Sequence, residues 1–164
     1  MGGQSGDRNP ADAIGSRREA RETALGVLYA ADSRGSDPLE VLADQPVQHE
    51  DYTIDLVEGV AEHIVEIDEL IDRFAEGWRT DRMPRVDLSL VRMAVFELGY
   101  RADVPTSAVL AEVVALVADY STERSGRFVN GVVSRINGFI GGINQGLEAL
   151  GSERRISLVP DLDL

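Results

Sequence analysis

The ten residues Arg124–Val133, RSGRFVNGVV, decide whether this chain is expected to form strands or helices. Asn130-Gly131 is the dipeptide that most favours a tight hairpin turn between two strands. A hairpin also needs flanking strands with alternating polar and apolar residues, and no segment of the chain shows that alternation next to turn signals. Phe128 and Val132 instead share one face of a helix. The stretch is therefore predicted to lie in the last helix of the protein.

The rest of the chain also has helical periodicity. Ser16 with Glu19 forms a capping-box pattern that predicts a helix start, and Gly35 predicts its end. The segment Thr106–Tyr120 is apolar on most sides and is expected to be the central, buried helix. The fold class is therefore all-α, with about seven helices in one domain. The expected helices are 16–34, a short helix after Asp37-Pro38, one carrying Leu56–Ile67 that breaks near Asp68, a short helix burying Leu70, Ile71 and Phe74, and the helices 86–100, 106–120 and 127–140.

Composition narrows the class of protein. The chain has 164 residues, of which 43% are hydrophobic, enough for one domain with a sizeable core. No window of about 18 residues is apolar and free of charge, so no membrane partner is expected. The first residues lack the apolar stretch of a secretory signal, and cysteine is absent, which is compatible with a reducing cytosol. A cytoplasmic location is the expectation.

The charge distribution is more informative than the net charge of −13, which by itself argues against binding a polyanion. All 16 cationic residues are arginines, the side chain that pairs bidentately with phosphate and stacks on bases. Arg17, Arg18 and Arg21 gather at the start of the first expected helix, where the helix dipole disfavours cations. Local helix stability therefore does not explain the cluster, and it is either an anion-binding site or a solvated helix end.

Enzyme chemistry finds no support in the motifs. His49 and His63 lie outside any metal-ligand spacing, and a P-loop is impossible without lysine. The glycine pattern near residue 140 does not form a dinucleotide fingerprint, and there is no cysteine or Gly-x-Ser-x-Gly nucleophile. The protein is predicted not to be an enzyme and to need no cofactor or metal. An acidic helical enzyme with a carboxylate site is a minor alternative.

Four segments resemble the NusB family of bacterial transcription antitermination factors, in the same order and with matching spacing over about residues 16–138. The motif Phe-Val-Asn-Gly-Val after an Asp-Val-Pro helix is the most specific part. The segments are SRREARETALGVLYA (16–30), VDLSLVRMAVFEL (86–98), DVPTSAVLAEVVALVADYS (103–121) and RFVNGVVSRI (127–136).

The resemblance implies two packed helical bundles and a regulatory function. Members of this family pair with the small-subunit ribosomal protein NusE, bind boxA single-stranded RNA of ribosomal RNA transcripts, and help the RNA polymerase antitermination complex resist termination. Matching the family's motifs, RNA contacts are expected at Arg17, Arg18, Arg21, Tyr29, Arg127, Phe128 and Asn130, and protein-partner contacts at Phe74 and Asp87.

Two departures from the family pattern affect the expected RNA affinity in opposite directions. Glu19 stands where relatives often have a third basic residue, and Arg124 stands where many have an acid. Residues 1–15 are expected to be a disordered extension, 16–140 the helical RNA-binding domain, and 141–164 a flexible acidic tail.

The alternatives are an acidic helical protein–protein module without RNA binding and the helical accessory domain of RNA cytosine methyltransferases, which the absence of cysteine disfavours. A homodimer is compatible with the sequence, as is a monomer.

Overall fold

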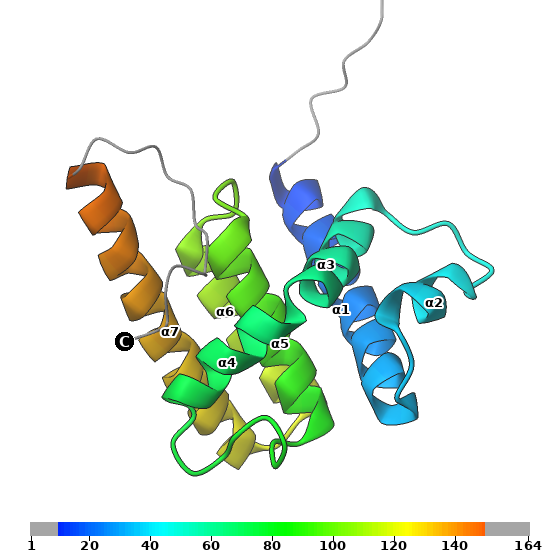
Figure 1. The fold of residues 1–164 in the computed structure, drawn as a ribbon. Coiled ribbons are helices and arrows are strands. Elements are labelled where there is room, and N and C mark those ends of the chain that lie inside the picture. Colours follow the sequence, from blue (N-terminus) through cyan, green and yellow to red (C-terminus); the bar gives the residue numbers. More distant parts are fainter. Residues whose placement is uncertain (1–9, 150–164) are drawn as a thin grey trace, which may run out of the picture.

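The computed structural model describes residues 10–149, which form seven helices and no strand, so the all-α prediction is confirmed (Figure 1). Within this part of the chain, no helix combines the length and the apolar character that a membrane crossing requires. The helices are α1 (Pro10–Arg34), α2 (Pro38–Ala43), α3 (Asp51–Glu62), α4 (Ile64–Phe74), α5 (Arg85–Tyr100), α6 (Thr106–Tyr120) and α7 (Glu123–Ala149).

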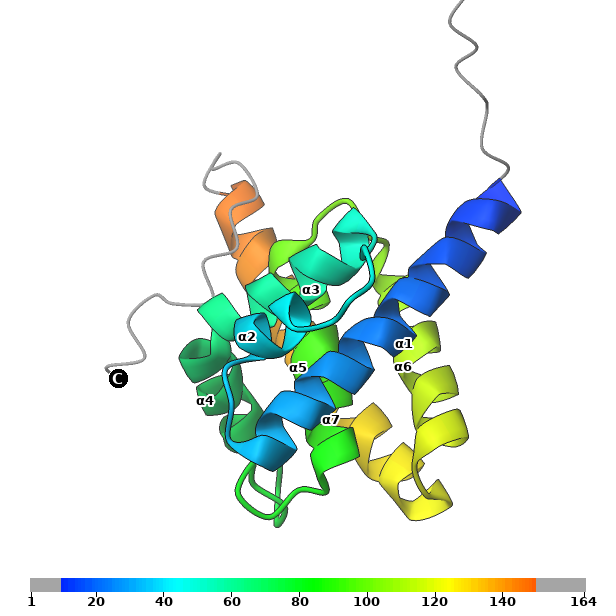
Figure 2. The ribbon, with the colours of Figure 1, turned by 90° about the vertical axis from the view of Figure 1, so that its right-hand side faces the viewer.

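The helices form two groups that meet at α5. Helices α1, α2 and α3 pack on one another, α4, α6 and α7 surround α5, and α1 and α3 also pack against α5 (Figures 1 and 2). Twelve of the residues in α5 are buried, so α5 is the central helix of the fold. The prediction that α6 is central is wrong, because α6 buries one face only and Val114 is 46% exposed.

Helix α1 begins at Pro10, six residues before the predicted start at Ser16. Proline suits the first helical position because its fixed φ is that of a helix and its missing N–H has no partner there anyway. Ser16 lies inside the helix, and its hydroxyl donates to Glu50 Oε2 at 2.8 Å instead of capping. The predicted capping box is therefore wrong. Residues 1–9 lie outside the described residues.

The second boundary error concerns the joint between α3 and α4, which lies at His63 and not near Asp68. His63 leaves the helical conformation with φ −109° and ψ 18°, and its ring stacks on Tyr100 at 4.0 Å between centroids. Asp68 lies inside α4, where its carboxylate accepts two hydrogen bonds from Arg92 of α5. The acid is therefore a packing partner of the central helix rather than a helix breaker.

Helix α7 begins at Glu123, inside the predicted loop STERSG. Thr122 precedes it, and its Oγ1 accepts the Ser125 backbone N–H at 3.1 Å, which is the contact of an N-cap. The helix continues to Ala149, so the boundary predicted at residue 140 falls inside it. The rest of the predicted acidic tail, 150–164, lies outside the described residues.

The close approach between α3 and α5 depends on a glycine. Gly59 of α3 is buried, and a Cβ placed at this position would overlap the phenyl ring of Phe96 on α5. The ring therefore occupies the space where any other residue would place its side chain. This contact sets how closely the first group of helices approaches the central helix.

We expect Gly59→Ala to destabilise the protein by about 1–3 kcal/mol, because the added methyl group forces Phe96 or α3 to move. Gly26→Ala is the matched control: Gly26 lies in α1, where an added Cβ would have nothing within 4 Å, and the change should stabilise by about 0.5–1 kcal/mol. Urea unfolding measures both. If Phe96→Leu fails to relieve part of the Gly59→Ala defect, the steric explanation is wrong.

Candidate nucleic-acid interface

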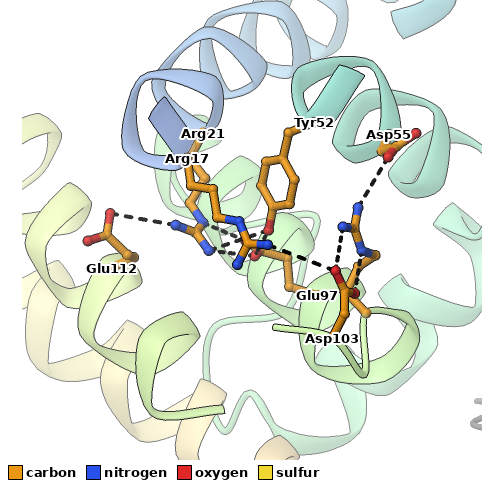
Figure 3. A network of polar contacts seen from close by, with 8 residues as sticks. Arg17, Arg21, Tyr52, Asp55, Glu97, Asp103 and Glu112 are labelled. Atoms are coloured by element: carbon orange, nitrogen blue, oxygen red, sulfur yellow. Dashed lines mark hydrogen bonds and ion pairs between the residues drawn. The ribbon is translucent and has the colours of Figure 1, made fainter. Parts of the chain in front are cut away.

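Arg21, predicted as an RNA contact, lies inside the protein. Its side chain is 4% exposed, and that of Glu97, its partner on α5, is 2% exposed. Arg21 Nε donates to Glu97 Oε1 at 2.9 Å and Nη2 donates to Oε2 at 2.8 Å, a bidentate pair (Figure 3). Glu112 of α6 adds a second carboxylate 3.9 Å from Nη1. Arg21 therefore joins α1 to the central helix and is not available to an RNA at the surface.

Tyr52 of α3 completes this buried site. Its hydroxyl donates to Glu97 Oε2, so one carboxylate binds side chains from both α1 and α3 (Figure 3). Burial, and next the negative charge of Glu97, raise the pKa of Tyr52, so the phenol keeps its proton. For Arg21, burial alone would lower the pKa, but the hydrogen bonds and charge of Glu97 outweigh it and raise the pKa. The arginine is therefore always charged.

Two further arginines lie over the ring of Tyr52, at the edge of this network. The guanidinium of Arg17 lies 5.3 Å and that of Arg101 4.8 Å from the ring centroid, within the range of cation–π attraction. Arg101 donates two hydrogen bonds to Asp103, at 2.8 and 2.9 Å, and these lower the pKa of Asp103 to about 2. Arg17 Nη2 lies 4.0 Å from the same carboxylate (Figure 3). The Arg17 side chain is 39% exposed, and its ion pair with Asp103 is long, so its guanidinium can still contact a ligand at the surface.

Of the other two predicted contacts on α1, Arg18 is partly buried and Tyr29 is exposed. The Arg18 side chain is 41% exposed and pairs with Asp119 of α6 at 2.7 Å and with Glu22 at 3.6 Å. A polyanion would have to compete with these two carboxylates for the guanidinium. Tyr29 is 44% exposed and lies about three turns further along the helix.

The predicted contacts on α7 lie in its second turn. Arg127 and Asn130 are exposed, whereas Phe128 is half-buried and packs edge-on against Trp78 at 5.0 Å between ring centroids. Trp78 belongs to the connection between α4 and α5, so Phe128 faces that connection and not α1. Figure 1 shows α1 and α7 on opposite sides of α5 and α6. The RNA contacts expected on α1 and those expected on α7 therefore lie in two separate patches.

The connection that carries Trp78 is fixed by hydrogen bonds that the sequence did not reveal. Asp72 on α4 accepts the backbone N–H of Thr80 at 2.7 Å and its hydroxyl at 3.1 Å. Gly77 has φ +80°, a conformation that favours glycine. The Arg124 guanidinium lies 5.5 Å from the Trp78 ring centroid. The aromatic neighbour of Phe128 thus comes from a polar segment. In the sequence, the single tryptophan was the only feature of this segment that could have indicated a binding site.

The two predicted protein-partner residues, Phe74 and Asp87, make most of their contacts inside the protein. Asp87, in the first turn of α5, is fully buried, and its Oδ1 accepts the Ser121 hydroxyl at 2.6 Å. Phe74 at the end of α4 is half-buried and packs against Phe139 at 5.4 Å between centroids. Phe74 can still contribute an edge to a surface, but Asp87 in this conformation contributes no exposed group.

Whether these side chains could bind a metal ion depends on how they are grouped. Among the described residues, no three His, Cys, Asp or Glu side chains are grouped as metal ligands. The arrangement instead offers guanidinium, amide and aromatic groups, which suit phosphates and bases.

These features define a small, two-part helical protein with arginines and an aromatic–asparagine segment at its surface. The solved structures that it resembles include NusB of T. maritima, at 30% identity and a TM-score of 0.68, covering 74% of this chain and 90% of that one. Another is a crystal structure of the antitermination factors NusB and NusE in complex with dsRNA, at 34% identity and a TM-score of 0.66, covering 76% and 97%.

The chain belongs to the NusB family, whose family model matches residues 18–137. Among its curated relatives, the transcription antitermination protein NusB of Acidothermus cellulolyticus is 48% identical over 124 residues, covering 73% of this chain and 86% of the relative. That of a Nocardioides species is 44% identical over 127 residues, covering 75% and 94%. The resemblance found in the sequence is thereby confirmed.

We expect Glu97→Gln to lower the free energy of unfolding by about 3–5 kcal/mol, because it removes the bidentate partner of a buried charge and leaves only the more distant carboxylate of Glu112, 3.9 Å from Arg21 Nη1. Tyr52→Phe removes only one hydrogen bond to the same carboxylate and should cost about 1.5 kcal/mol. Urea unfolding followed by circular dichroism compares the two variants. Equal losses would mean that the ion pair is not what holds α1 on α5.

The Asp103 carboxyl should titrate with a pKa of about 2, because Arg101 binds its ionised form. A lowered folded-state pKa stabilises the protein above the unfolded value, near 3.8, and this contribution is lost as the pH falls toward 2. NMR of the carboxyl carbon gives the midpoint. Arg101→Gln should return it toward 3.8, and an unchanged midpoint in that variant would contradict the assignment.

Proposed function

We propose that this protein is an RNA-binding transcription antitermination factor that acts with NusE. In this proposal it binds the boxA element of ribosomal RNA transcripts and helps RNA polymerase resist termination. The observation that carries the proposal is the family match over residues 18–137, together with the likeness to a chain whose structure contains NusB, NusE and dsRNA.

The described surface supports contact with a polyanion at two patches. The first, here called the α1 patch, consists of Arg17, Arg18 and Tyr29. The second, the α7 patch, consists of Arg127 and Asn130 with the edge of Phe128. Both contain groups that bind phosphate or stack on bases. Arg21 is left out, because its guanidinium is buried against Glu97.

Charge favours a shared rather than an autonomous RNA site. A protein of net charge −13 repels RNA at long range, and Arg18 is already paired with two carboxylates. A basic partner protein would supply the missing positive charge and further RNA surface. We therefore expect the protein to bind RNA weakly when alone and more tightly in the presence of NusE.

A second candidate, a protein–protein module without RNA contact, is favoured by one observation. An open hollow of about 590 Å³ between α2, α3 and α4 is lined by both apolar and acidic side chains, a combination that suits a basic partner with an apolar contact surface. Its lining residues are Asp37, Pro38, Leu39, Glu58, Ala61, Glu62 and Ile64. Partner binding that persists in the absence of any RNA binding would favour this candidate.

Arg127→Gln should weaken binding of a boxA-containing RNA by the protein–NusE complex. For each lost phosphate contact, the slope of log K against log salt concentration should fall by about 0.7 for single strands. Arg34→Gln is the matched control, because Arg34 is an exposed arginine in the last turn of α1 and belongs to neither patch. Fluorescence anisotropy with labelled RNA measures affinity and slope.

Three outcomes would contradict the proposal. They are an affinity that NusE does not increase, equal losses in the two variants, and binding of boxA RNA that is no tighter than binding of a scrambled sequence of equal length. The same RNA in duplex form is included, because the complex that this chain resembles contains dsRNA.

A further inference from the structure

A second open hollow lies beside the α7 patch, where the α4–α5 connection meets the start of α7. It has a volume of about 280 Å³ and is lined by Glu76, Gly77, Trp78, Arg124 and Phe128. We refer to it as the Trp78 hollow. Its volume lies just below the range of about 300–1,000 Å³ that is usual for drug-sized ligands, so a single planar ring system is the natural occupant.

The lining of the Trp78 hollow selects for an aromatic ring. Trp78 and Phe128 meet edge to face, and the Arg124 guanidinium lies over the indole. Indole, phenyl and guanidinium are the three groups on which nucleobases stack. Because one cation and one carboxylate, Glu76, line the same hollow, its charges offset each other. A neutral base therefore suits it better than a phosphate does.

The hollow is also held in shape before any ligand arrives. Asp72 binds the backbone and side chain of Thr80, just after Trp78, and Arg135 of α7 donates to the Phe74 carbonyl just before the connection, at 3.0 Å. The connection is thus tied to α4 on one side and to α7 on the other. A preformed site loses less entropy on binding than a loop that must first be ordered.

From these contacts we infer that the Trp78 hollow binds one unstacked nucleobase of the RNA, with Trp78 as the stacking surface and Arg124 as its cationic neighbour. The inference rests on the proposed RNA-binding function and adds to it a site for a base, in which Trp78 and Arg124 lie outside the segments that carried the family resemblance and Phe128 lies within one of them. Arg127 and Asn130, on the exposed side of the same helix, then contact the adjoining backbone.

The chain provides its own reporter, because Trp78 is the only tryptophan in the sequence. The full-length protein with NusE is titrated with labelled boxA-containing RNA, and anisotropy and tryptophan fluorescence, corrected for any tryptophan in NusE, are recorded together. The same titration at about 1 M salt, where counterion effects suppress binding, gives the optical baseline. We expect the Trp78 emission to fall in parallel with the rise in anisotropy.

A set of RNAs with one abasic position each then locates the base. One position should abolish the quenching of Trp78 and lower the affinity by about 5- to 150-fold, the equivalent of 1–3 kcal/mol for one stacked base. Arg124→Gln should weaken the quenching and the affinity severalfold, whereas Arg34→Gln, which removes an equal charge elsewhere, should leave both within about twofold, as expected for a distant exposed site.

Each other outcome decides against the inference. RNA binding by anisotropy without quenching of Trp78 overturns the base site and leaves the proposed function intact. Quenching that no abasic position removes means that Trp78 senses a conformational change and not a base. Absence of RNA binding with and without NusE overturns the proposed function itself, together with the inference.

Discussion

The bidentate pair between Arg21 and Glu97 is the contact on which the arrangement of the two helical groups depends. Burying two charges costs free energy that only close pairing recovers, so the pair tolerates little change in its geometry. Glu97 also accepts the Tyr52 hydroxyl, which brings α3 to the same point. The contact between Gly59 and Phe96 fixes the spacing of α3 and α5 nearby. The position of α1, and with it the α1 patch, follows from these few contacts.

This arrangement explains why Arg21 is buried whereas Arg17 and Arg18, in the same cluster, are partly exposed. Arg17 and Arg21 are four residues apart, a spacing that places them on one face of the helix. The α1 face that carries Arg21 packs against α5, and Arg17, one turn earlier, already lies at the edge, where its guanidinium rests over Tyr52. A helix periodicity defines faces, but it does not say how far along the helix a neighbouring helix reaches.

Local patterns in the sequence sufficed for most elements of the fold. The bounds of α6 agree with the prediction to the residue, because proline precedes it and polar residues follow it, and α2 begins after the Asp37 cap as expected. Two of the errors, at Asp68 and in the burial of α6, originate in contacts between distant segments. Asp68 resembles a helix break because its partner Arg92 is 24 residues away, and the exposed face of α6 could not be distinguished from a buried one without knowing that α5 occupies the centre.

For the candidate site too, the sequence predicted local features but not contacts between distant segments. Arg127 and Asn130 are exposed, as an RNA contact requires. The separation of the α1 and α7 patches depends on how the helices pack around α5, and the position of Trp78 depends on how the α4–α5 connection meets α7, so the sequence could not predict either. Acids usually lie at the surface, whereas Asp87 is buried: its Oδ1 accepts the Ser121 hydroxyl, and its Oδ2 has no hydrogen-bond partner among the described residues.

The Arg21–Glu97 pair has a consequence for the order of events during synthesis. Its two members are separated by 76 residues, so Arg21 leaves the ribosome well before its counter-charge exists. At about 5–20 residues per second, the delay is about 4 to 15 s. During that interval the apolar face of α1 has no central helix to cover it. Helix α1 can pack on α2 and α3 as soon as they are made, but its side that faces the centre of the fold stays uncovered until α5 arrives.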